Sequence, residues 1–469
     1  MWQSDSKRFI YMIVLAAISL AATIVCGVNS YSLPASFENL VYLPFGNTFA
    51  TLLFVAALVR GNFYLDMPIF VLTTLFTVRN AITPMVMSVT TCASRIGIYP
   101  DSGMVDLGIA LFLYETVAVY FFLFLIRNKS LNIKKMFVPT WHAPEGTFAI
   151  VLTSGVAISV LCFVLLPELR TQYYTIFTND ITHVIQQSVV YSGGIKRALS
   201  TSASMIIEAT RLTLSSVLIF KLRKYKESWY TYLACVSIIL IQFFFMNDSN
   251  AYVIMIAFSL YLLVYKLFPK YGKTTMRYLV FIVVAFFVLI YINRFSQDIY
   301  GQSLSVFLQA YLPGLNNFAT IEPLMDRGVG DAVRQFFIDL YGAVPFKSTL
   351  LGYQGGMDVL PIIWQKSTNL LGQIMPNIAQ SYYYFGPVLC PILSIVLCYI
   401  GVISFKKANV TTNPCMYTIF IYLSLYTCVS ITMYDFYIFF KMFLTRFLFM
   451  YIFSYFCKEQ MPLDISNRV

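Results

Sequence analysis

The chain alternates between apolar runs of about 20 residues and short polar turns, many of which carry lysine or arginine. A helix of that length crosses the hydrocarbon core of a bilayer while satisfying its own backbone hydrogen bonds. The pattern therefore predicts an all-α polytopic membrane protein with about twelve transmembrane helices. The predicted spans are Phe9–Val28, Leu40–Leu58, Phe63–Thr77, Leu107–Ile126, Phe148–Leu166, Leu199–Phe220, Trp229–Met246, Ala251–Tyr265, Tyr278–Asn293, Ser381–Ser404, Cys415–Met433 and Phe436–Phe456.

One long, mostly polar interruption, Arg294–Gln380, separates the ninth predicted span from the tenth. It divides the chain into residues 1–293 with nine spans, residues 294–380, and residues 381–469 with three spans and a tail. A connection this long between packed elements is usually functional. Asp331–Tyr341 has apolar residues at helical spacing and predicts a short amphipathic helix along the membrane face. Two shorter outer segments are expected at Arg79–Asp106 and Pro167–Arg197.

The distribution of basic residues predicts the orientation of the chain in the membrane. Apolar residues make up 59% of the chain and charged residues only 11%, against about 25% in soluble proteins. Most of the 32 lysines and arginines, but few of the 21 acids, fall in alternate turns, which places those turns, the N-terminus and the C-terminal tail in the cytoplasm. The net charge of +11 is thus a topology signal, and no nucleic-acid partner is expected. The first span is long enough to remain as an anchor.

Basic residues outside the cytoplasmic turns are the candidates for chemistry, because the positive-inside bias disfavours them there. Guanidinium groups bind pyrophosphate oxygens in a bidentate fork, and ionisable groups at membrane depth are usually functional. The candidate catalytic residues are Arg211, Glu208 and Arg294. The candidate pyrophosphate-binding residues are Lys196, Arg197, Arg327, Arg334, Lys441 and Arg446.

Glu208 and Arg211 lie three residues apart in the sixth predicted span, so they share one helix face and can pair. The pair is either a structural ion pair inside the bundle, or an anion ligand (Arg211) with its orienting group or general base (Glu208). Glu115, in the fourth span, is expected to be a satisfied interior group. Asp435 is expected at the outer mouth.

The sequence lacks the residues that several common catalytic and metal-binding sites require. The nine cysteines form no CxxC pair or Cys/His cluster, and the two histidines, His142 and His183, do not form a site. Leu267 stands where the first glycine of a phosphate loop ending at Gly272-Lys273-Thr274 would be. The chain has no Asp-x-Asp pair and no metal-ligand cluster, so no metal or cofactor is expected. The energy for a reaction must then come from the substrate.

The topology, together with several short stretches, resembles the bacterial oligosaccharide repeat-unit polymerases, the O-antigen polymerase family. Two stretches resemble the arginine-bearing edges of outer loops: Tyr191–Arg197, a small-residue turn ending in a basic pair, and Tyr291–Arg294 at the start of the large loop. The remaining stretches resemble the large loop and its return to the membrane, and they are Leu312–Phe318, Ala332–Phe336, Gly372–Pro376 and Tyr382–Gly386. Some members also have a glycine eleven residues after an outer arginine. Arg170, Arg294 and Arg334 lack it.

The resemblance implies a GT-C-like architecture in the bacterial inner membrane with a large periplasmic loop between helices 9 and 10. It implies a metal-independent glycosyltransferase that joins undecaprenyl-pyrophosphate-linked repeat units and releases undecaprenyl pyrophosphate. Arginines would then stabilise the departing pyrophosphate, and a chain-length regulator would be a partner alongside membrane lipids. Two alternatives share the pathway: a lipid-linked oligosaccharide flippase, which usually lacks one dominant outer loop, and an O-antigen ligase, for which a histidine in the long loop would be expected. Arg294–Gln380 contains no histidine.

Overall fold

A computed structural model gives the fold, and it describes residues 5–60, 67–93, 99–126, 147–166, 195–223, 225, 228–242, 250–268, 288, 292, 303–325, 328–346, 359–370, 373–411 and 413–456. All regular structure in these residues is helical. Eight of the described helical segments are long and apolar enough to cross a membrane, so the protein is a polytopic helical membrane protein. Shorter apolar helices occupy the predicted fifth, seventh and eighth spans. Nearly all of the predicted ninth span, Tyr278–Asn293, lies outside the described residues.

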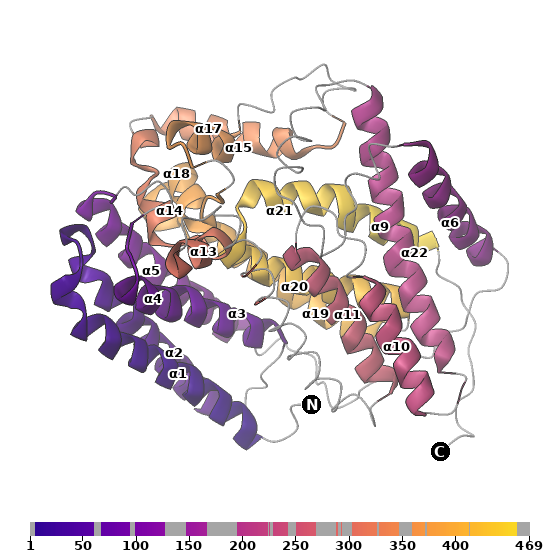
Figure 1. Ribbon diagram of the computed structural model, residues 1–469, viewed down its shortest axis with the longest axis horizontal. Coiled ribbons are helices and arrows are strands. Elements are labelled where there is room, and N and C mark those ends of the chain that lie inside the picture. The colour runs from indigo at the N-terminus through magenta and orange to yellow at the C-terminus, as the bar shows by residue number, and fades with distance from the viewer. Residues whose placement is uncertain are drawn as a thin grey trace.

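The helices before the long polar stretch form two groups (Figure 1). The first group consists of α1 (Asp5–Val28), α2 (Tyr42–Arg60), α3 (Met67–Thr77), α4 (Thr83–Val89) and α5 (Ser102–Ile126), with two short 3₁₀ segments, η1 (Ser30–Ser32) and η2 (Ala35–Val41), between α1 and α2. The second group consists of α6 (Thr147–Leu165), α9 (Ile195–Leu222), α10 (Trp229–Ile241) and α11 (Asn250–Leu267). Within the second group α6 packs beside α9, at the edge of the molecule in this view.

The polar stretch folds into short helices that gather at one end of the bundle (Figure 1). They are α13 (Leu304–Tyr311), α14 (Leu315–Ala319), the 3₁₀ turn η6 (Glu322–Leu324), α15 (Val329–Ala343) and α17 (Leu360–Ser367). We call them the outer layer, after the predicted outer stretch in which they lie. The amphipathic helix predicted at Asp331–Tyr341 is confirmed as the body of α15. The outer layer rests on α4, α5, α18 and α21.

The C-terminal part returns through α18 (Asn377–Leu389), α19 (Ile392–Val410), α20 (Pro414–Met433), α21 (Phe436–Met442), the π-helical turn η7 (Phe443–Phe447) and α22 (Leu448–Phe456). Helix α20 is the centre of the bundle, because it packs on α3, α9, α11, α18, α19 and α22. Two of its serine hydroxyls are satisfied within the bundle: Ser430 Oγ donates to Tyr426 O at 2.7 Å, and Ser424 Oγ donates across to Gly401 O at 2.7 Å. A Cβ at Gly401 would lie 2.7 Å from Thr427 Oγ1, so glycine lets α19 and α20 approach closely.

Two predicted boundaries are wrong. The third span does not end at Thr77, because the π-helical turn η3 (Val78–Ile82) joins α3 to α4, and the apolar helix continues to Val89. Arg79 therefore lies inside a helix and not in an outer segment. The tenth span is not one helix from Ser381 to Ser404 either. Gly386 has a positive φ of 72° before Pro387, and a turn separates α18 from α19.

Candidate functional site

The predicted pair in the sixth span is confirmed. Arg211 Nη2 lies 2.7 Å from Glu208 Oε2 on one face of α9. Glu208 is 1% exposed, and the Arg211 side chain is only 12% exposed. The ion pair thus lies within the helix bundle.

Two other helices bring side chains to this pair. Tyr252, near the start of α11, donates a hydrogen bond of 3.4 Å from its hydroxyl to Glu208 Oε2. The guanidinium of Arg446, in η7, lies 4.0 Å from the centroid of the Tyr252 ring. We call Glu208, Arg211, Tyr252 and Arg446 the arginine centre. Every member is largely buried.

The surroundings of the arginine centre are aromatic. Tyr422 of α20 packs against Tyr252 with ring centroids 5.3 Å apart, and against Phe447 at 4.5 Å. Tyr426, one turn further along α20, lies 5.2 Å from the Phe447 ring. The centre brings two guanidinium groups and one carboxylate together in a low-dielectric environment. Preorganised cations in such a place attract and stabilise an anion far more strongly than they would in water.

For the other predicted basic residues, the structure gives an exposed position, the backbone alone, or no description. Arg334 on α15 and Lys441 on α21 are exposed. Lys196 and Arg197 lie in the first turn of α9, where the structure describes the backbone only. About 21 Å of helix rise separates Arg197 from Arg211. Arg294 and Arg327 lie outside the described residues, as does His183.

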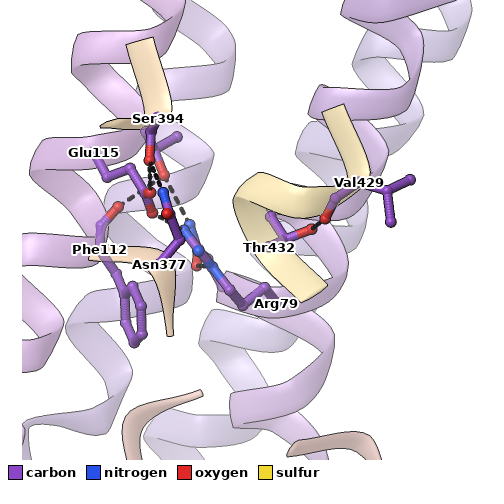
Figure 2. Close-up of polar contacts among 9 residues, drawn as sticks. Arg79, Phe112, Glu115, Asn377, Ser394, Val429 and Thr432 are labelled. Atoms are coloured by element: carbon purple, nitrogen blue, oxygen red, sulfur yellow. Dashed lines mark hydrogen bonds and ion pairs between the residues drawn. The ribbon is translucent and has the colours of Figure 1, made fainter. Parts of the chain in front are cut away.

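A second buried ion pair lies within the first helix group and is linked to the C-terminal part through Ser394 (Figure 2). Arg79 Nη2 lies 2.6 Å from Glu115 Oε2, and both side chains are fully buried. The other carboxylate oxygen accepts a hydrogen bond from Ser394, whose hydroxyl accepts one of 2.8 Å from Asn377 Nδ2. Asn80 accepts from Arg79 Nε at 3.1 Å. We call these five residues the Arg79 network. Glu115 is a satisfied interior group, as the sequence predicts.

A third polar cluster anchors the outer layer through Asp339 of α15. Its Oδ1 accepts hydrogen bonds from Gln335 Nε2 at 2.8 Å and from the Leu360 backbone N at 2.9 Å. Its Oδ2 accepts from the Tyr384 hydroxyl and from Gln380 Nε2 at 3.1 Å. Burial raises the pKa of Asp339, and these four hydrogen bonds oppose the rise. With four donors, Asp339 ties α15 to α17 and α18.

Asp435 lies close to this cluster, because the next residue, Phe436, hydrogen-bonds to Gln380. The expectation that Asp435 faces an outer opening is wrong, because this residue is 1% exposed. Its side chain caps α21 by accepting a hydrogen bond of 2.7 Å from Ile438 N. Gln380 links Asp339 to the start of α21, because its Oε1 accepts from Phe436 N at 2.6 Å. Burial raises the pKa of Asp435 to about 7.

Sequence reasoning missed Tyr252 and Asp339. Neither residue stands out along the chain, because Tyr252 is one of 34 tyrosines and Asp339 lies in an ordinary amphipathic helix. The only available signal for Asp339 was its position on the apolar side of α15, near Phe336 and Leu340. Among the described residues, no group of three or more His, Cys, Asp or Glu side chains is arranged to hold a metal ion.

Comparison with known proteins gives no relative from which a function could be carried over. No family model matches the chain. No curated protein and no solved structure matches it either. The arginine centre is therefore interpreted from its own geometry.

Proposed function

We propose that this protein is an O-antigen polymerase, a membrane glycosyltransferase that joins undecaprenyl-pyrophosphate-linked repeat units on the periplasmic face of the bacterial inner membrane. The arginine centre is the observation that carries the proposal. It gathers two guanidinium groups and a carboxylate among aromatic side chains within a bundle of apolar helices. Ionisable groups are costly at membrane depth and are usually retained for a function.

In the proposed reaction, a hydroxyl of the acceptor repeat unit attacks the anomeric carbon of the donor glycan. The new glycosidic bond forms as the bond to undecaprenyl pyrophosphate breaks, and the departing pyrophosphate takes the hydroxyl proton. Negative charge builds on the pyrophosphate in the transition state, and Arg211 and Arg446 stabilise it. Both can offer two parallel N–H donors to phosphate oxygens.

Glu208 acts in this scheme as the group that orients Arg211. Its carboxylate is held by the Arg211 guanidinium at 2.7 Å and by the Tyr252 hydroxyl. Tyr252 holds Arg446 by a cation–π contact on its ring and Glu208 by its hydroxyl. The four side chains therefore act as one unit.

The test replaces Arg446 in a strain deleted for the gene and complemented from a plasmid. Arg446→Met removes the charge and should abolish long chains, leaving single repeat units on the lipid A core. Arg446→Lys keeps the charge but loses the planar fork, so it should restore elongation only in part. Gel profiles of the surface polysaccharide provide the measurement, and the amount of protein in the membrane is the control for insertion.

The same gels separate the alternatives. Uncapped core in the deletion strain indicates a flippase or a ligase, whereas core capped with one repeat unit indicates a polymerase. Long chains in the Arg446→Met strain, with normal protein level, would refute the role of the arginine centre.

A further inference from the structure

A small hollow in the outer layer is lined mainly by side-chain amides. Gln309 of α13, Asn316 and Asn317 of α14, and Gln373 form its polar wall, with Val306 and Leu370 as apolar neighbours. The four amide side chains are almost completely buried. The hollow is partly open, and its enclosed part has room for about one hydroxyl group or water.

Hydrogen bonds fix how these amides are oriented. Asn316 Nδ2 donates to Cys92 O at 2.9 Å and to Ala93 O at 3.3 Å, so this nitrogen is fully used. Gln309 Oε1 accepts the Asn316 backbone N–H at 3.2 Å. Asn317 Nδ2 donates to Gln373 Oε1 at 3.2 Å and to Ile374 O at 2.9 Å. Exchanging N and O in any of these amides would break the bonds.

Two polar atoms of the wall remain unused. Gln309 Nε2, a donor, and Asn316 Oδ1, an acceptor, have no hydrogen-bond partner in the described part of the chain. Both residues are only 3% exposed, and leaving such groups unsatisfied costs about 1–3 kcal/mol each. The hollow thus presents one unused donor and one unused acceptor, and the residues described in its wall carry no charge.

One hydroxyl group satisfies both atoms at once, because it can accept from Gln309 Nε2 and donate to Asn316 Oδ1. An anion would face the Asn316 oxygen with no cation in the described wall to hold it, and an ammonium ion would face the Gln309 donor. The chemistry of the wall therefore selects a neutral hydroxyl-bearing ligand. The size of the enclosed part admits the hydroxyl, while the ring that bears it stays outside.

We propose that this hollow is a subsite that recognises one hydroxyl group of the saccharide that the protein binds. The proposal rests on the proposed function in taking a saccharide as the occupant. A site that hydrogen-bonds a buried hydroxyl rejects analogues lacking it strongly, because its polar groups are then left unpaired. The subsite thus contributes to the choice of repeat unit, apart from the pyrophosphate held by the arginine centre.

Gln309→Glu is the sharpest test, because Glu keeps the acceptor for the Asn316 N–H and replaces the unused donor by an oxygen. The probe is the set of oligosaccharides released by mild acid from the surface polysaccharide of the source strain, which carry no pyrophosphate. Saturation-transfer NMR measures their binding to the full-length protein in detergent. We expect binding at pH 8 to weaken at least about 10-fold in the variant. It should recover toward pH 5, where the new carboxyl is protonated and can donate.

Asn369→Asp is the matched control, since it makes the same chemical change at an exposed residue beside Leu370. It should bind the oligosaccharides like the wild type. Gly314→Ala is the second variant, in case Gln309→Glu does not fold. A Cβ at Gly314 would lie 3.2 Å from Gln309 Oε1 and would displace that side chain without removing a polar group. It should weaken binding by a smaller factor.

The outcomes separate this inference from the proposed function. Unchanged binding at pH 8 in folded Gln309→Glu and Gly314→Ala, or no binding to the wild type, means that the hollow holds only water and overturns the inference. If polymer is lost in Arg446→Met while Gln309→Glu binds the oligosaccharides normally, the result supports the polymerase proposal and refutes the subsite. If binding is lost in Gln309→Glu while Arg446→Met makes normal polymer, the subsite stands and the proposed mechanism falls.

Discussion

Two buried arginines in this protein have different electrostatic surroundings. The Arg79 guanidinium lies 4.5 Å from the Phe112 ring centroid and is matched by one carboxylate, which is itself hydrogen-bonded by Ser394. The Arg446 guanidinium likewise lies over a ring, that of Tyr252, and the same centre holds a second guanidinium, Arg211, paired with Glu208. The Arg79 network thus contains one guanidinium and one carboxylate, whereas the arginine centre brings two guanidinium groups together. We infer that the first serves stability and the second serves binding.

This difference predicts the behaviour of variants in the Arg79 network. Glu115→Gln leaves a buried guanidinium uncompensated, which should lower the free energy of unfolding by about 3–5 kcal/mol. The double variant Arg79→Met/Glu115→Gln removes both charges and should recover most of that loss. Thermal unfolding of the purified protein in detergent measures both. If the double variant is no more stable than Glu115→Gln, or if it folds well but makes no polymer, the assignment of Arg79 to stability is wrong.

At the scale of elements, both arginines lie in π-helical turns. Arg79 is in η3, between α3 and α4, and Arg446 is in η7, between α21 and α22. A π-helical turn places one extra residue in a helix and redirects the side chains around it, and such turns are frequent at functional sites. Each turn here carries its arginine to the interior of the bundle, where apolar helix faces would otherwise meet. Helical periodicity alone does not reveal these turns.

The outer layer provides a pH-dependent test at this scale. The pKa of Asp435 is about 7 in the folded protein, against an ordinary value of 3.8, so the folded state holds the proton more tightly than the unfolded state. Stability should therefore fall as the pH rises from about 4 to about 7, by at most about 4 kcal/mol from this group. Asp435→Asn still caps α21 but cannot ionise, so its melting temperature should depend less on pH and exceed that of the wild type at pH 8.

Some pH dependence of the melting temperature should remain in Asp435→Asn, because burial also raises the pKa of the neighbouring Asp339. Lys441, the nearby cation, acts in the opposite direction on Asp435. Asp331→Asn, at an exposed acid of α15, is the control and should leave the pH profile unchanged. Parallel profiles for Asp435→Asn and the wild type would show that Asp435 does not titrate in this range.

Much of the helix pattern could be predicted from the sequence, but only one contact of the site could. Long apolar runs such as Phe9–Val28 are local features, and so is the three-residue spacing of Glu208 and Arg211. Tyr252 and Arg446 meet only because α11 and η7 both pack on α9, and no spacing along the chain records that packing. Asp339 and Gln309 could not be singled out for the same reason, since their partners lie on other elements.

For the whole molecule, the proposed function depends on which side of the membrane the outer layer occupies. The positive-inside bias places Tyr31, in the turn after α1, outside, and Lys407, in the last turn of α19, inside. Both side chains are exposed and should accept a probe.

Single cysteines at these two positions, in a chain freed of its own nine cysteines, test the orientation. Tyr31→Cys should react with a membrane-impermeant maleimide in intact spheroplasts. Lys407→Cys should react only after lysis. The reverse pattern would put the outer layer in the cytoplasm and end the periplasmic polymerase proposal.

The central position of α20 also has a consequence for biogenesis. The ribosome makes α20 after α3, α9 and α11, yet these helices pack around it. Until α20 enters the bilayer, Ser216 of α9 lacks the Thr418 hydroxyl that it contacts at 3.0 Å in the finished bundle. The earlier helices therefore enter the bilayer before the helix on which they pack. Their final packing is completed only after α20 has been inserted.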